Sequence, residues 1–429
     1  MTPRTPLSIA ILGAGPTGLE AALAAAERGL AFTLYETAGG VAGHVRDWGH
    51  VELFSPWAYD ISPRARRALS AAGVEPPDPS DPACPTGKEL VERVLGPLGE
   101  LAQIQQHLRT GVKVVSVGRE GLLKHEEIAS DVRRAQPFRL LLRDSSGHEW
   151  VENANAVLDC TGSYSRPNAL GDGGIPAPGE IPLAEEIHRT IPDFDSQRAE
   201  WSGRTILVVG AGHSALTAVS ELADLAASSP GTSVVWALRH ERPGWHVDPN
   251  DPLPGRSRLG ERAHSLLAGS SPAVLPICGV VVDSVSRDGP RFAVGLRRTD
   301  GVVETVHVDK ILSLTGSVGD HDLYRQLQIH ECYATLGPMK LAAALLASTG
   351  SGGSGGSSSA DCLDQESLGA ETLVNPEPAF FILGAKSYGR NSSFLMRLGW
   401  EQVDDVFALL DVPGSESGRA PSQSNTINP

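Results

Sequence analysis

The sequence predicts an α/β protein made of two Rossmann-like dinucleotide-binding domains, the second inserted into the first. Two segments that run strand, glycine turn, helix and strand carry this prediction, and they begin at residues 7 and 205. Each segment is followed by β-hairpins and then by a strand that ends in Thr-Gly, at residues 161–162 and 315–316. This internal repeat is the most informative feature of the chain.

The first segment has the pattern of a dinucleotide-binding turn. A strand at 7–12 enters Gly13-Ala-Gly15-Pro16-Thr17-Gly18, an alanine-rich helix runs on to Gly29, and a second strand at 31–35 ends in Glu36. Gly13 permits the tight turn, Gly15 allows close approach of a pyrophosphate, and Gly18 allows the helix to pack on the strand. Glu36 stands where a carboxylate accepts hydrogen bonds from a ribose diol. We predict dinucleotide binding here, and the alternative is a plain strand-to-helix turn.

The second segment repeats the first with one informative change. A strand at 206–209 enters Gly210-Ala-Gly212-His213-Ser214-Ala215, a helix covers 214–227, and a strand follows at 233–238. Alanine is tolerated at the third glycine position. Arg239 and Arg242 follow the last strand, where the first segment has Glu36. Because arginine accepts the 2′-phosphate of NADP, we predict NADPH at this segment, and the alternative is a pair of solvated surface arginines.

The rest of the chain completes the two predicted domains. Hairpin strands are predicted at 112–117, 138–143 and 149–158, and again at 280–285, 292–297 and 302–308. A further strand and a last helix are predicted at 379–384 and 394–410. The expected first domain comprises residues 1–200 and 311–411, and the expected inserted domain comprises 201–310. The Gly/Ser stretch at 349–360 predicts a flexible loop, and the polar tail at 412–429 predicts disorder.

The composition excludes several classes of protein. The 429 residues carry 36 basic and 51 acidic side chains, a formal net charge of −15, which argues against a nucleic-acid-binding surface. No apolar run approaches the roughly 18 residues that a membrane helix needs. The cysteines lack metal-ligand and CxxC spacing, so we expect no metal site, no local redox disulfide and a reducing, cytoplasmic location. They are Cys84, Cys160, Cys278, Cys332 and Cys362.

These motifs resemble those of the flavin-containing monooxygenase-like branch of the two-dinucleotide-domain flavoproteins, over nearly all of residues 7–411. The resemblance implies that the first domain holds FAD non-covalently and that the inserted domain holds NADPH. It also implies cofactor contacts from Thr161-Gly162, from Thr315-Gly316 and from Gly43. The stretches at 48–57, 210–215 and 386–390 are similar to flavoproteins encoded beside bacterial arsenic-resistance genes. Trp48 is expected to wall the flavin pocket, with core packing as the alternative.

Two departures from the family count against oxygenation. The family's aromatic-Gly-x-x-x-His fingerprint is degraded around His188, which lacks both the glycine and the aromatic residues. Ser55 stands where flavin monooxygenases place an asparagine near the flavin. Both departures leave the two-cofactor architecture intact.

The segment after the strand at 379–384 supplies the remaining candidates. Relatives carry Gly-Asp there, with the acid on the ribityl chain, whereas this chain has Gly384-Ala385. Lys386 and Arg390 follow, and the Asn-Ser-Ser run at 391–393 is expected to cap the last helix. If that helix points its N-terminus at the flavin ring, as the resemblance implies, both cations would stabilise the negative charge of reduced flavin. The alternative is a solvated basic loop.

Three functional hypotheses follow. The first is an NADPH-dependent monooxygenase, in which reduced FAD reacts with molecular oxygen and a flavin hydroperoxide oxygenates a heteroatom of a small-molecule substrate. The second is a flavoprotein reductase or dehydrogenase that passes electrons to another acceptor. The third is a flavin-binding protein without catalytic activity. Disulfide reductase chemistry is disfavoured, because the sequence has no cysteine pair of the required spacing.

Overall fold

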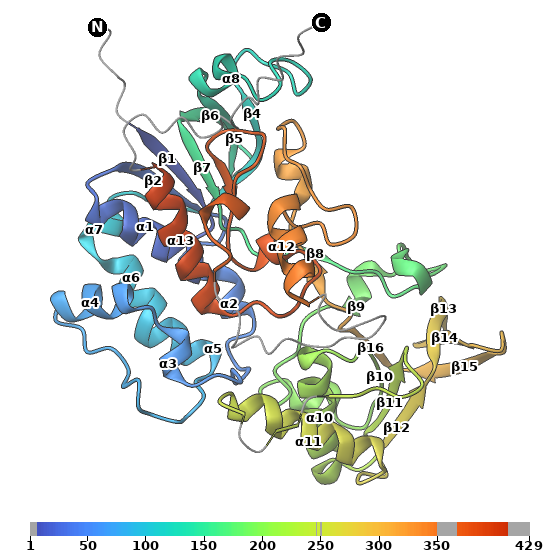
Figure 1. Ribbon diagram of the computed structural model, residues 1–429. Helices are drawn as coiled ribbons and strands as arrows, with labels where there is room; N and C mark the ends of the chain where they lie inside the picture. Colours follow the sequence, from blue (N-terminus) through green and yellow to red (C-terminus); the bar gives the residue numbers. More distant parts are fainter. Residues whose placement is uncertain (1–6, 246, 249–250, 350–366, 411–429) are drawn as a thin grey trace, which may run out of the picture.

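The computed structural model describes residues 7–245, 247–248, 251–349 and 367–410. It has two lobes, each built on a five-stranded parallel sheet, and the first lobe contains both the first strand and the last helix (Figure 1). The predicted fold of two Rossmann-like domains, one inserted into the other, is confirmed.

The first sheet brings together strands from distant parts of the chain. Its order is β18 (Phe380–Ile382), β7 (Ala156–Asp159), β1 (Ser8–Leu12), β2 (Ala31–Glu36) and β3 (Leu108–Thr110). All neighbours pair in parallel, with Ile11 of β1 opposite Leu34 on one side and Leu158 on the other. Because β1 is central and covered on both faces, its sequence is continuously apolar rather than alternating.

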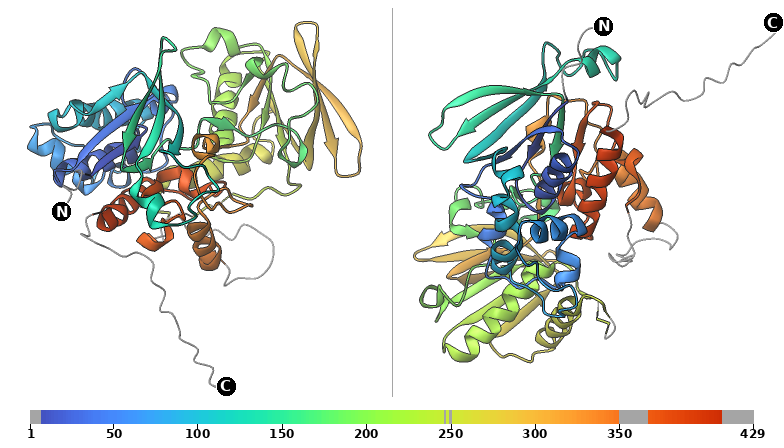
Figure 2. Two further views of the ribbon diagram at one scale, coloured as in Figure 1. Left: turned by 90° about the horizontal axis from the view of Figure 1, so that it is seen from above. Right: turned by 90° about the vertical axis from the view of Figure 1, so that its left-hand side faces the viewer.

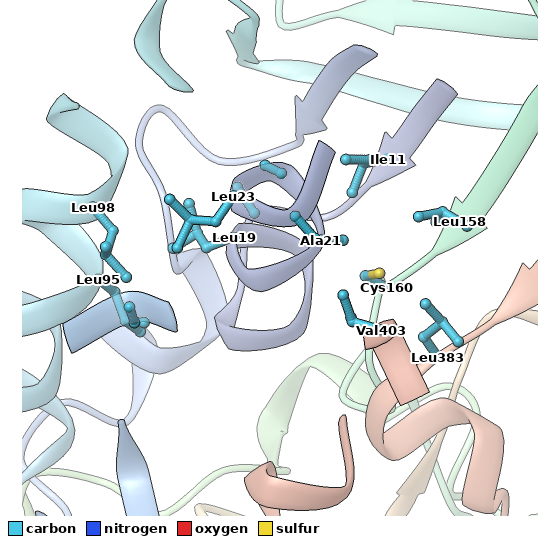
Figure 3. Close-up of a cluster of buried hydrophobic side chains, with 14 of the residues drawn as sticks. Ile11, Leu19, Ala21, Leu23, Leu95, Leu98, Leu158, Cys160, Leu383 and Val403 are labelled. Carbon is cyan, nitrogen blue, oxygen red and sulfur yellow. The ribbon is translucent and has the colours of Figure 1, made fainter. Parts of the chain in front are cut away.

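Helix α1 (Pro16–Glu27) joins the two ends of the chain in one core. Its residues 18–25 are all buried, which explains a sequence that is apolar on nearly every side; the one charged residue among them, Glu20, forms an ion pair with Arg64. It packs against α13 (Met396–Leu410). Figure 3 shows Leu19 and Leu23 of α1 between Leu95 and Leu98 on one side and Leu158, Leu383 and Val403 on the other.

The other helices of the first lobe are short. They are α2 (Gly43–Asp47), α3 (Trp57–Asp60), α4 (Pro63–Ala71), α5 (Gly87–Leu90), α6 (Gly96–Glu100), α7 (Ala102–Gln105), α8 (Asp131–Ala135) and α12 (Met339–Thr349).

The second lobe repeats the design of the first. Its sheet order is β12 (Val274–Cys278), β11 (Ser233–Leu238), β10 (Thr205–Val209), β16 (Lys310–Ser313) and β9 (Ile187–His188), all parallel. Helices α10 (His213–Ser228) and α11 (Pro254–Leu267) pack on each other over a core that contains Trp236, and the short α9 (Arg198–Trp201) adds Trp201.

Each lobe also carries the predicted three-stranded antiparallel sheet, and both stand out from their lobes (Figure 2). The first consists of β4 (Val112–Arg119), β5 (Phe138–Asp144) and β6 (Glu149–Ala154), and the second of β13 (Val280–Asp288), β14 (Arg291–Arg298) and β15 (Val303–Val308). The register shifts at the same place in both, at Val114/Ser116 and at Val282/Ser284. The internal repeat therefore extends to the position of a β-bulge.

The lobes meet at boundaries that differ from the expected ones. The two chain crossings, β8 (Arg166–Pro167) and β17 (Ser317–Val318), pair with each other. Strand β16 lies beside β10, with Ile206 opposite Lys310, so the chain returns to the first lobe after residue 315 rather than at 311. Leu170 and Ile187 pack in the core beneath β13–β15, so the end of the expected first domain belongs to the second lobe.

Two further expectations concern the C-terminal part. Helix α13 begins at Met396, two residues later than expected. The expected loop at 349–360, apart from Thr349, and the tail at 412–429 lie outside the described residues. Within the described part of the chain, no helix is long and apolar enough to cross a membrane.

Candidate functional site

The first glycine turn joins β1 to α1 in the shape that its sequence predicts. Gly13 has φ +91°, the left-handed region that favours glycine, and a Cβ there would lie 2.8 Å from the Cys160 carbonyl oxygen. A Cβ on Gly18 would overlap the Gly13 carbonyl oxygen. Gly15 is the N-cap of α1, with Pro16 next to it, and no atom lies within 4 Å of its Cβ position. The turn therefore presents open space at a helix N-terminus, where an anion binds favourably.

Glu36 at the end of β2 is fixed beside this turn. Its Oε2 accepts a hydrogen bond from the Ala14 backbone N–H (2.8 Å), and its Oε1 accepts one from Ala38 (2.9 Å). A Cβ on Gly43, the first residue of α2, would lie 3.3 Å from Oε1 and 2.6 Å from the Ala38 Cβ. The carboxylate is thus oriented by the backbone at the carboxyl edge of the sheet, with Gly43 close to it.

The segment after β18 also lies against the first glycine turn. Gly384 has φ +70°, and a Cβ there would lie 2.7 Å from Thr17 Oγ1 in the first turn of α1. A Cβ on Gly399 of α13 would lie 2.8 Å from the same oxygen. Thr17 therefore needs glycine at both C-terminal positions, which locks α13 onto the start of α1.

Lys386 lies in a different environment from the one expected. Its side chain is fully buried, and its ammonium donates to Asp159 Oδ2 (2.6 Å), the Asp320 carbonyl oxygen (2.9 Å) and Thr161 Oγ1 (3.2 Å). The Tyr324 ring centroid lies 4.9 Å from Nζ. An ammonium has three donors, and all three are used. The structure thus places Lys386 in a buried ion pair, neither in a solvated loop nor with a donor free for a ligand.

This ion pair orients the first strand-end motif. Asp159 Oδ1 accepts hydrogen bonds from the Thr161 backbone N–H (3.1 Å) and from Thr161 Oγ1 (2.6 Å). Gly162 follows with φ +71°. Asp159 and Lys386 together therefore connect β7, the crossing back from the second lobe and the segment after β18.

Arg390 and Asn391 lie between Lys386 and α13. Arg390 is exposed, and its Nη1 lies 3.4 Å from Asn168 Oδ1. Asn391 Oδ1 accepts hydrogen bonds from the Ser393 backbone N–H (3.0 Å) and hydroxyl (2.7 Å). Asn391 therefore closes a local turn before α13 rather than capping the helix, because such short polar side chains bond equally well to a turn two residues on.

Ser55 pairs with an acid that the sequence did not single out. Ser55 Oγ donates to Asp60 Oδ1 at 2.7 Å, and both side chains are buried. Burial raises the pKa of Asp60 to about 7, although the hydrogen bond from Ser55 opposes that shift. Trp48, on the same segment, packs against the core of the first lobe, and its Nε1 is buried without a partner among the described residues.

The raised pKa of Asp60 makes stability depend on pH. Below about pH 4 Asp60 is protonated in both folded and unfolded chains; between about 4 and 7 only the folded chain keeps the proton. The free energy of unfolding should therefore fall as pH rises through this window, by at most about 1.4 kcal/mol per pH unit from this group. Urea denaturation of wild type and Asp60→Asn at pH 5, 6 and 7 measures the difference. Parallel profiles would contradict this prediction.

The second glycine turn joins β10 to α10. Gly210 has φ +139°, and a Cβ there would overlap the Leu314 carbonyl oxygen. Two tryptophans donate hydrogen bonds to backbone carbonyl groups of this turn. Trp236 Nε1 donates to the Gly210 carbonyl oxygen (3.0 Å), and Trp245 Nε1 donates to the Ala211 carbonyl oxygen (2.9 Å). Gly212 is the N-cap of α10, and His213 and Ser214 are exposed in its first turn.

The second strand-end motif and the two arginines border this turn. Thr315 Oγ1 donates to the Asn168 carbonyl (3.1 Å), Asn168 Nδ2 donates to the Thr315 carbonyl (3.0 Å), and Gly316 has φ +84°. Thr315-Gly316 therefore ties the two chain crossings together. Arg239 and Arg242 follow β11 and are exposed.

The geometry defines a class of protein. Two glycine turns, each at a helix N-terminus on the carboxyl edge of a parallel sheet, characterise oxidoreductases that bind two dinucleotides. A family model described as pyridine nucleotide-disulphide oxidoreductase matches residues 7–249. The chain belongs to this family.

Solved structures with similar folds cover nearly the whole chain. The FAD-bound cadaverine monooxygenase of Erwinia amylovora has a TM-score of 0.65 at 13% identity, covering 98% of this chain and 100% of that one. The bacillithiol disulfide reductase of Bacillus cereus has a TM-score of 0.62 at 16% identity, covering 95% of this chain and 99% of that one. The reduced ornithine hydroxylase of Pseudomonas aeruginosa has a TM-score of 0.62 at 15% identity, covering 95% of this chain and 99% of that one. At these identities the likeness establishes the fold alone.

One curated protein matches over a short region. The glutamyl-tRNA reductase of Micrococcus luteus is 34% identical over 120 residues, 27% of this chain and 26% of that protein. The chain thus spans about a quarter of the length of this relative.

Sequence reasoning missed Asp159 and Asp60 as members of the site region. A signal existed for Asp159, since it is the charged residue in the otherwise apolar strand that leads to Thr161-Gly162. Asp60 carries no such signal, because its burial depends on the tertiary packing around α3. Trp236 and Trp245 were likewise missed, since indole hydrogen bonds to a turn leave no sequence pattern.

Proposed function

We propose that the protein binds FAD at the first glycine turn and NADPH at the second, and oxygenates a nitrogen, sulfur or arsenic atom of a small substrate. The carrying observation is the pair of glycine turns, one at a helix N-terminus in each lobe, in a chain whose described cysteines, Cys84, Cys160, Cys278 and Cys332, form no disulfide. This arrangement supplies two dinucleotide turns, and no two cysteines of the sequence have the CxxC or CxxxxC spacing of a redox dithiol. It favours electron transfer from nicotinamide through a flavin to oxygen over electron transfer to a protein disulfide.

The residues present at the first turn fit FAD. Gly15 leaves space for a pyrophosphate at the N-terminus of α1, and the fixed carboxylate of Glu36 is placed to accept ribose hydroxyls. Thr161 and Gly162, oriented by Asp159, border the same edge of the sheet. The flavin would supply hydride acceptance and oxygen reactivity, and these side chains would bind and orient it.

A second candidate function is a flavoprotein reductase without oxygenation. Reductases stand among the similar folds, and Ser55 occupies the position of the family's asparagine, which supports this alternative. The decisive measurement is anaerobic reduction by NADPH followed by rapid mixing with oxygen. Slow return of the oxidised flavin spectrum, with delayed peroxide release, is expected of a monooxygenase. Immediate reoxidation with stoichiometric peroxide would favour the reductase, and failure of NADPH to reduce the protein would favour the inactive alternative.

Arginine at the end of β11 should set the preference for NADPH. Replacing Arg239 with alanine removes a charge-assisted hydrogen bond to the 2′-phosphate, worth on the order of 1.5–3 kcal/mol, or roughly ten- to a hundredfold. The NADPH Michaelis constant should rise by that factor, while the NADH constant stays nearly unchanged. Steady-state flavin reduction with both cofactors measures the split. An equal loss with NADH would assign Arg239 a structural role instead.

A further inference from the structure

The segment at residues 48–60 packs against the cores of both lobes. Leu53 and Phe54 pack against the core of the first lobe, and Val51 packs against that of the second. The Phe54 ring lies 5.0 Å from that of His213, which opens α10 directly after the second glycine turn. A Cβ on Gly255, at the start of α11, would lie 2.6 Å from the Phe54 Cα.

The same segment is linked to the first glycine turn through α13. Helix α3, which ends at Asp60, contacts α13. Helix α13 is in turn locked onto the first turn of α1 through Thr17 and Gly399. The segment that carries Ser55 and Asp60 is thus linked by packing to the helices that follow both glycine turns, and two bound dinucleotides would have to approach each other for hydride transfer.

Unpaired polar atoms are concentrated on this segment. Among the described residues, Trp48 Nε1, His50 Nε2 and Asp60 Oδ2 are all buried without a hydrogen-bond partner. Buried polar atoms are almost always paired, so each orphan needs an explanation. Three of them within thirteen consecutive residues point to a ligand that supplies the missing partners.

Asp60 is the most informative of the three. The residue is only 4% exposed, its Oδ1 accepts a hydrogen bond from Ser55, and in the described part of the chain no cation offsets the burial of its carboxyl group. An ionised carboxylate in such a place would cost several kcal/mol, whereas a neutral acid needs one acceptor for its O–H. Ser55 already occupies Oδ1, so the proton belongs on Oδ2, the orphaned oxygen.

We propose that Asp60 contacts the bound cofactor, donating a hydrogen bond from protonated Oδ2 to an amide-type ring carbonyl oxygen, while Ser55 holds Oδ1. Such a carbonyl occurs both on the flavin pyrimidine ring and on the nicotinamide carboxamide. The inference rests on the proposed binding of FAD and NADPH. The burial that raises the pKa of Asp60 to about 7 keeps it a donor below neutral pH.

Infrared difference spectra of wild type against Asp60→Asn test the protonation state. At pH 6 the wild type should have the carbonyl stretch of a neutral carboxylic acid, and the variant should lack it. If the flavin accepts the hydrogen bond, this band should move to lower frequency when the apoprotein binds FAD. If the nicotinamide accepts it, the band should move when NADP⁺ is added to the FAD-loaded protein. Glu221→Gln is the matched control, because the pKa of Glu221 is also raised to about 7 by burial and its band should not respond.

Affinity measurements supply the second test. Asp60→Leu should weaken binding of the accepting cofactor about 3- to 10-fold, the range of one lost hydrogen bond, and Asp60→Asn, which keeps an N–H donor, should restore most of it. The absence of a neutral-acid band at pH 6, or a band and affinities that neither cofactor changes, overturns the proposal. Failure of the proposed function is recognised separately, because a protein that binds no FAD stays colourless whatever Asp60 does.

Discussion

Replacing Lys386 with methionine is expected to lower the free energy of unfolding by about 3–5 kcal/mol, because the substitution leaves Asp159 charged and unpaired in the core. Both side chains are fully buried, and Lys386 Nζ lies 2.6 Å from Asp159 Oδ2. Methionine has a similar length and fills the same space, so the loss reports the broken pair rather than a cavity. Urea denaturation followed by circular dichroism measures the change.

The double variant Asp159→Asn/Lys386→Met is the control for this prediction. Asparagine keeps an oxygen to accept from the Thr161 N–H and hydroxyl, and no buried charge remains. The double variant should therefore recover most of the stability that the single variant loses. If the double variant loses as much as the sum of the single variants, the two residues are not coupled. A loss under about 1 kcal/mol in Lys386→Met would mean that water reaches the pair.

Lys386 also illustrates what the sequence could not predict. The sequence places it in a basic loop after a strand, and only the fold brings it to Asp159, 227 positions earlier, and to the Asp320 carbonyl. A buried lysine is stable only with such partners, and they are supplied by tertiary structure. The same holds for Asp60, which is buried only by the tertiary structure.

Elements with strong local signals were predicted closely. Strand β11 spans Ser233–Leu238, the predicted range, because an apolar run between Gly231 and Arg239 leaves little choice of ends. The predicted start of α13 was wrong, since the Asn391 side chain bonds to a local turn, and a side chain of this type is equally suited to a turn or to a helix cap. The domain boundary at 311 was wrong as well, because the strand at Lys310–Ser313 pairs with β10, and parallel pairing is a long-range property.

The largest functional effect is expected from Gly15→Asp, which should give a folded but colourless protein. Gly15 has φ −81° and ψ −170°, ordinary for any residue, and its Cβ position is open. It is also the N-cap of α1, where aspartate is among the favoured residues, so the apoprotein should keep its stability within about 0.5 kcal/mol. FAD, however, would meet a carboxylate where its pyrophosphate has to approach the helix N-terminus. Visible absorbance after purification and after incubation with FAD measures the loss.

Matched variants at the turn separate charge, size and fold. Gly15→Asn has the same shape as Gly15→Asp without the charge, so it should retain more FAD if electrostatic repulsion dominates, and equally little if bulk alone blocks the site. Gly18→Ala should instead destabilise the fold itself, because its Cβ would overlap the Gly13 carbonyl oxygen at the centre of the turn. If the Gly15→Asp variant still binds FAD and is yellow, then the pyrophosphate of FAD does not bind at the N-terminus of α1. If the wild-type protein is colourless and cannot be reconstituted with FAD, then it does not bind FAD, and the proposed oxygenation is wrong.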